Sequence, residues 1–95
     1  MDRASTEYLQ IPVTAAVDPT GYPVQIALIA STARPAEPDW HPATWTTIDG
    51  IPHAQLLVGP DGGALTLTAG RWRPWLDIDA GTEHPIIAAP AFDIT

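Results

Sequence analysis

Apolar and polar side chains alternate along residues 65–79, and this stretch defines the fold expected for the chain. Leu65 and Leu67 alternate with threonines, and Gly70 then interrupts the run. One side of the run that follows carries the large apolar residues Trp72, Pro74, Leu76 and Ile78. The other side carries mostly charged residues and one aromatic residue, namely Arg71, Arg73, Trp75, Asp77 and Asp79. A period of two is typical of half-buried strands, so the pattern predicts two strands with a shared core face.

The spacing of Leu67, Gly70 and Trp72 predicts a corner at the start of the second strand. In immunoglobulin-like sandwiches, a large aromatic residue that begins a strand folds back onto the loop before it. Here the aromatic residue is tryptophan, so an indole N–H has to replace the usual phenol as the hydrogen-bond donor. We interpret the stretch as the central corner of a small β-sandwich. Pro74 further predicts that this strand lies at an edge or carries a bulge.

Two apolar runs precede this corner. Residues 8–17 alternate weakly, and Pro12 removes a backbone donor there, so we expect an edge strand or a bulge. Residues 24–29 are apolar on both sides, which predicts a central strand. A turn is expected between the two runs, at the Asp-Pro-Thr-Gly sequence of residues 18–21.

Proline-rich and glycine-rich segments separate the remaining runs. Residues 31–52 contain four prolines, and we expect them to be irregular except for a short strand at 45–48 that crosses between sheets. Residues 53–58 predict a strand, and the glycines of residues 59–63 predict a hairpin that connects it to residues 65–68.

Short apolar runs at 86–89 and 92–94 complete the pattern, and no segment shows helical spacing. The expected fold is therefore all-β, a single immunoglobulin-like antiparallel β-sandwich of about seven short strands. Residues 1–7 are polar and are expected to form a flexible N-terminal arm, and residues 8–95 the β-sandwich domain.

The chain of 95 residues has a net charge of −7, with eleven acidic residues, four arginines and no lysine. Nucleic-acid binding requires clustered positive charge, so we expect no nucleic-acid partner, and an anionic membrane surface is disfavoured for the same reason. There is no cysteine, which excludes disulfides and thiolate metal sites. No apolar run approaches the roughly 20 residues of a membrane span, and the first residues lack a signal-peptide pattern.

The densest group of possible metal ligands is Asp77, Asp79, Glu83 and His84. Alternate acids, a glycine and a later carboxylate have some features of a calcium loop. A solvated strand end followed by a polar turn is the simpler interpretation, and we expect neither a metal nor another cofactor. His41, His53 and His84 have no short ligand spacing, so a shared zinc site is not expected either.

Catalytic motifs are also lacking in the sequence. Ser5 and Ser31 are the only serines, and neither lies in a Gly-x-Ser-x-Gly elbow. The glycine-rich residues 59–63 lack the lysine and the following helix of a phosphate-binding loop. We therefore expect no enzymatic activity and no catalytic residues.

The chain resembles a family of small virion proteins encoded by tailed phages of actinobacteria. Four stretches carry the resemblance. They are residues 17–24 with their turn, the Asp-Trp-x-x-Ala-x-Trp pattern of 39–45, the Leu-Leu-Val-Gly-Pro run of 56–60 with the glycines at 62 and 63, and residues 65–78 with the pattern Leu-x-x-Gly-x-Trp-x-x-Trp-Leu-x-Ile. The sequences at 83–86 and 92–94 match in style. The resemblance implies a single immunoglobulin-like sandwich encoded among the head and neck genes.

The expected function is then that of a non-enzymatic structural subunit of the virion, made in the host bacterial cytoplasm. It would be capsid-associated or a head–tail connector or neck protein, with capsid, portal or connector subunits as partners in many symmetric copies. Aromatic residues and arginines are enriched at protein interfaces. On this basis the candidate contact residues are Tyr8, Trp40, Arg71, Arg73 and Trp75.

Two alternatives remain open from the sequence. Trp75 could instead pack beneath a loop, such as the segment around Trp40 and Trp45. Exposed Trp40, Trp45 and Trp75 could also stack on sugars, which would make the domain a carbohydrate- or host-surface-binding module.

Overall fold

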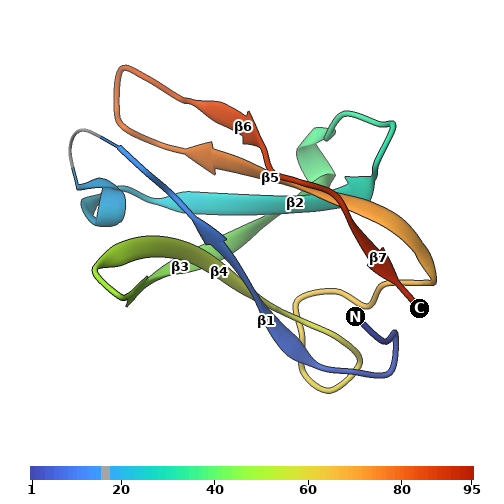
Figure 1. Ribbon diagram of the computed structural model, residues 1–95. Coiled ribbons are helices and arrows are strands. Elements are labelled where there is room, and N and C mark those ends of the chain that lie inside the picture. The colour runs from blue at the N-terminus through green and yellow to red at the C-terminus, as the bar shows by residue number, and fades with distance from the viewer. Residues whose placement is uncertain (16–17) are drawn as a thin grey trace.

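The computed structural model describes residues 1–15 and 18–95, and these residues form an all-β structure (Figure 1). The strands within them are β1 (Glu7–Pro12), β2 (Val24–Ala30), β3 (Trp40–Ile48), β4 (Ile51–Val58), β5 (Gly70–Ile78), β6 (Ile86–Ala88) and β7 (Phe92–Ile94). Two short 3-10 turns, η1 (Pro19–Gly21) and η2 (Glu37–Asp39), interrupt the connections.

The strands form one antiparallel sheet that curls into a half-barrel. Its order is β1-β4-β3-β2-β5-β6, and β7 pairs with β5 beyond the end of β6. The predicted all-β antiparallel class is confirmed. Edge position for β1 and central position for β2 are confirmed as well. Residues 16 and 17, the end of the run from which the first strand was predicted, lie outside the described residues.

Strand β3 connects the two halves of the curled sheet. Its first residues, Trp40 to Ala43, pair with β2, whereas Thr44 to Ile48 pair with β4. The expected crossing between two sheets takes the form of a change of pairing partner within one curled sheet. The strand begins at Trp40 rather than at Trp45, because Pro42 is accommodated opposite Gln25 instead of ending the strand.

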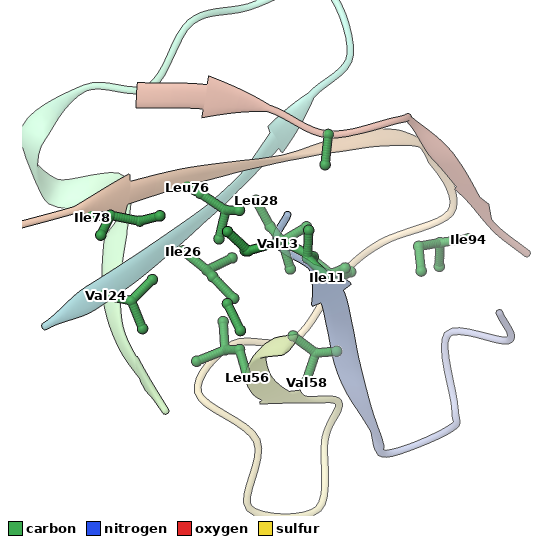
Figure 2. Packing of buried hydrophobic residues seen from close by; sticks show 13 residues of the cluster. Ile11, Val13, Val24, Ile26, Leu28, Leu56, Val58, Leu76, Ile78 and Ile94 are labelled. Atoms are coloured by element: carbon green, nitrogen blue, oxygen red, sulfur yellow. The ribbon is translucent and has the colours of Figure 1, made fainter. Parts of the chain in front are cut away.

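The concave side of the sheet holds the hydrophobic core (Figure 2). Alternate residues of the long strands point inward, as a period of two requires. The buried cluster consists of Ile11, Val13, Val24, Ile26, Leu28, Ala54, Leu56, Val58, Leu67, Leu76, Ile78, Ala89 and Ile94. No polar side chain is buried among the described residues, so inward packing is wholly apolar.

The predicted corner before β5 is confirmed. The indole Nε1 of Trp72 donates a 2.9 Å hydrogen bond to the carbonyl oxygen of Thr68. Trp72 is half-buried against the core, and Leu67 is buried. Trp45 makes a similar closure elsewhere, since its Nε1 donates to the carbonyl oxygen of Tyr22 at 2.8 Å.

Two predictions for this region are wrong. Residues 65–68 are a loop rather than a strand; Gly59 N donates to Leu65 O and Ala64 N to Leu57 O, which folds the segment back onto the end of β4. Leucine and threonine alternate in residues 65–68 because this loop buries the side chain of Leu67 and leaves the threonines exposed. Strand β5, expected from Pro74 to be an edge or to carry a bulge, is not an edge, because β2 pairs along it on one side and β6 and β7 pair on the other. Its register with β2 is unbroken from Trp72 to Ile78.

Both chain ends lie together at one end of the half-barrel (Figure 1). The Met1 amino group donates to Asp93 O at 3.0 Å. Thr95 N donates to Met1 O at 2.8 Å, and Arg3 N donates to Thr95 O at 2.9 Å. The segment expected to be a flexible arm thus has backbone partners in the residues of β7 and just beyond it.

Candidate functional site

The outer face of the β3–β2–β5–β6 region holds most of the candidate contact residues. Register places Trp40 and Trp75 directly opposite Ala27 on its two sides, with Ala88 next to Trp75. Directly opposed residues point to the same face of a sheet. Because neighbouring strands lie about 4.8 Å apart, the two tryptophans are separated at the backbone by roughly 10 Å.

Trp75 is half-buried beneath the segment of residues 31–39. The Arg34 guanidinium carbon lies 5.2 Å from the centroid of the Trp75 ring, within cation–π range. The indole Nε1 of Trp75 is buried and has no hydrogen-bond partner in the part of the chain that the structure describes. The alternative in which Trp75 packs beneath a loop is therefore observed, with Arg34 as the covering residue.

Arg73 forms a contact within the fold. Ala89 N donates to Pro74 O at 2.9 Å, so residues 74 and 89 form a hydrogen-bonded pair of the β5 ladder. Proline has no N–H to return the second bond of that pair to Ala89 O. Arg73 Nη1 donates to this carbonyl oxygen at 3.0 Å instead. The arginine side chain thus supplies the donor that Pro74 lacks.

The other two candidate contact residues are more exposed and lie apart. Arg71 Nη1 lies 3.5 Å from Asp93 Oδ1, with the two side chains 62% and 64% exposed, an arrangement that contributes little to stability. Tyr8 is 59% exposed but lies on β1, which β4, β3 and β2 separate from β5. The structure therefore brings Trp40, Arg71, Arg73 and Trp75 onto one face and leaves Tyr8 elsewhere.

The acidic cluster at the end of β5 is organised around a histidine. His84 Nδ1 lies 3.4 Å from Asp77 Oδ1, and its Nε2 lies 3.1 Å from Asp79 Oδ1. The turn is closed by Ala80 N, which donates to Glu83 O at 2.9 Å. Among the residues with described positions, no three histidines or acids are grouped as metal ligands. This arrangement is a turn in which one imidazole bridges two carboxylates.

Asp18 has a pKa shifted by the hydrogen bonds of its own turn. Its carboxylate accepts hydrogen bonds from Thr20 N at 3.0 Å and from Thr20 Oγ1 at 2.8 Å. These bonds favour the ionised form, and the backbone bond above all lowers the pKa of Asp18 below its ordinary value. The carboxylate caps η1 and confirms the turn predicted there.

Two strand edges form features that sequence reasoning did not connect. Strands β1 and β6 end the sheet order, and depressions lie between them along Val13, Thr14 and Ile87. The prolines at 12, 85 and 90 were the available signal, because proline is confined to edge strands and strand ends. A linear sequence does not show which two edges will face each other.

Comparisons of the chain with protein-family models, curated proteins and solved structures find no match. None of the helical turns in residues 1–15 and 18–95 is long or apolar enough to cross a membrane.

Proposed function

We propose that the protein is a non-enzymatic structural subunit of a tailed-phage virion that acts through contacts with other virion proteins. Within this proposal, the curled sheet is a variant of the immunoglobulin-like sandwich, in which β3 passes from one layer to the other. Its place would be on the capsid, at the head–tail connector or in the neck.

The observation that carries the proposal is the Leu67–Gly70–Trp72 corner. It is central to the family resemblance, and its indole bonds to Thr68 O as the corner pattern predicts. Trp45 also belongs to a pattern that carries the resemblance, and its indole donates to Tyr22 O. This second bond supports the same interpretation. Both tryptophans therefore have structural roles that a family would retain for its fold.

A contact surface for a virion partner is available on the outer face. Trp40 lies there on β3 and Arg71 on β5, and Arg71 makes a weak surface ion pair with Asp93. Tryptophan and arginine are the residues that most often dominate binding energy at protein interfaces. If many copies of the protein bind the particle, a patch of this kind on each copy would be enough for attachment.

The test is the composition of purified particles. Mass spectrometry of virions from a phage that carries the gene should find the protein in a fixed copy number per particle. The double variant Trp40→Ala, Arg71→Ala should fold but be depleted from particles at least tenfold. Glu37→Ala, an exposed change in η2, serves as the control with normal incorporation. Particles that lack the wild-type protein would refute the proposal.

A carbohydrate-binding module is the second candidate, because Trp40 and Trp75 share the outer face. Aromatic side chains on one face can stack on sugar rings. Trp45, the third member of the expected platform, packs against the core on the other side of the sheet. Quenching of tryptophan fluorescence by a host-wall polysaccharide, lost in Trp40→Ala, would favour this function over the first.

A further inference from the structure

Strand β6 presents a backbone edge that has no strand partner within residues 1–15 and 18–95. Ile78 N donates to Pro85 O, and Ala89 N donates to Pro74 O. Hydrogen-bonded and non-bonded pairs alternate in an antiparallel ladder, so Pro85, Ile87 and Ala89 direct their backbone groups toward β5. Ile86 and Ala88 consequently direct their N–H and C=O groups to the open side of the sheet. Such an edge is a template for another strand.

An apolar groove runs beside this edge, between β6 and the segment that follows β1. It consists of two adjoining depressions of about 260 Å³ and 350 Å³, which share Val13, Thr14 and Ile87. The first continues toward Ala89 and Pro90, and the second toward Ile78 and Pro85. The shared residues make the two depressions one surface for an extended ligand.

The spacing of the groove suits alternate side chains of a strand. The depressions lie on the two sides of Ile87, the first toward Ala89 and the second toward Pro85. Positions two residues apart in a strand are separated by about 6.6 Å and point to the same side. In β-strand addition, backbone bonds supply affinity and pockets for alternate side chains supply specificity.

The negative charge near the groove favours a ligand that carries positive charge. Among the lining residues that the structure describes, Glu83 is the one with a charged side chain, and Asp18 lines the neighbouring depression. All four arginines, Arg3, Arg34, Arg71 and Arg73, lie outside the residues that line it. A second copy of this chain, with net charge −7, would add to the negative potential rather than balance it.

We propose that the β6 edge and its groove bind an extended segment of a partner protein that alternates apolar residues and carries a lysine or arginine near Glu83. The bound segment would add a strand beside β6 and continue the half-barrel. This inference concerns a surface distinct from the outer face, and it holds whether or not the partner belongs to a virion.

The test uses the 95-residue chain and two synthetic probes. One is the peptide Lys-Val-Thr-Val-Thr-Val-Lys, and the other has glutamate in place of both lysines. In an amide NMR titration at low salt, the basic peptide should shift and protect the Ile86 and Ala88 amides. It should also bind at least tenfold more tightly than the acidic peptide, because only the basic one complements Glu83.

Two adjacent isoleucines provide matched variants. Ile87 is 44% exposed and lines the groove, whereas Ile86 is 52% exposed and points to the outer face opposite Asp77. Ile87→Asp should weaken the basic peptide at least tenfold, and Ile86→Asp should change its affinity less than twofold. Circular dichroism checks that both variants are folded. The NMR titration of the wild-type chain tests the binding site even if a variant fails to fold.

Three results would overturn the inference. The basic peptide could fail to bind at millimolar concentration, bind no better than the acidic one, or shift amides of β1 and not those of β6. Sedimentation that shows an Ile87→Asp-sensitive dimer would assign the groove to a second copy. None of these readouts depends on particle composition, so a failure here is distinct from a failure of the virion proposal.

Discussion

The two faces of strand β2 are packed in different ways. On the inner face, Ile26 and Leu28 are buried in a cluster to which β1, β4, β5 and β7 all contribute. On the outer face, Ala27 and Ile29 are also buried but lie outside that cluster. Their cross-strand neighbours there are Trp75 and Arg73, and the Arg34 guanidinium lies over the Trp75 ring.

Tryptophan indoles show what this difference means. Inner-side Trp45 and Trp72 each place the indole N–H on a backbone carbonyl. Trp75 on the outer face buries the same group without a partner among the described residues. An unpaired buried donor costs about 1–3 kcal/mol, so the inner face is optimised for stability and the outer face is not. The outer face thus retains a polar group that a bound partner could satisfy.

The largest effect should come from shortening an isoleucine on each face. Ile26→Ala should lower the free energy of unfolding by about 4 kcal/mol, because a fully enclosed site cannot collapse around the cavity. Ile29→Ala should cost about 2 kcal/mol, since Ile29 lies outside the main cluster beside the half-buried Arg73, whose side chain can move inward. Urea denaturation measures both. Equal losses would mean that the outer layer is packed as firmly as the core.

Replacing Trp72 and Trp75 by phenylalanine should change the stability of the protein in opposite directions on the two faces, or leave it unchanged on the outer face. Trp72→Phe should destabilise the protein by about 1 kcal/mol or more, because the bond to Thr68 O and some packing area are lost. Trp75→Phe should be neutral or stabilising, since it removes a buried donor that has no acceptor. Thermal denaturation of the two variants checks this, and a marked loss in Trp75→Phe would contradict the contrast.

A double-mutant cycle tests whether Arg73 compensates for Pro74. Arg73→Ala should cost about 1 kcal/mol, because Ala89 O loses its donor. In a Pro74→Ala background the backbone N–H of residue 74 becomes available to that oxygen. The arginine substitution should then cost less, with a coupling of about 0.5–1 kcal/mol. Additive effects in urea denaturation would show that the arginine bond is incidental.

Most of the inner face was predictable from the sequence, and much of the outer face was not. Period-two alternation identified Leu76 and Ile78 as core, and the corner motif identified the partner loop of Trp72. Residues 65–68 failed the same rule, because one buried leucine between threonines also fits a loop that folds back on β4. Alternation of apolar and polar residues indicates which side chains are buried, but a buried side chain can belong to a loop that pairs with no other strand.

The outer-face contacts depend on tertiary placement. Arg34 is 41 positions from Trp75, and only the fold places its guanidinium over that ring. Pro74 suggested an edge because a proline weakens a ladder, but a neighbouring arginine supplied the missing donor. The sequence therefore predicted which residues leave the core, and the structure determines whether those residues meet a partner or each other.

Asp18, which belongs to neither face, should give the smallest effect and the only one that depends on pH. Its pKa is lowered in the folded state, so its stabilisation is present above the ordinary carboxyl value of about 3.9. It is lost as pH falls through the lower folded value. The melting-temperature difference between wild type and Asp18→Ala should hold from pH 7 to 5 and shrink below about pH 4. Asp18→Asn keeps a cap that does not titrate, so its advantage over the alanine variant should persist at low pH. If that advantage vanished in parallel with the wild-type one, ionisation of residue 18 could not be the cause.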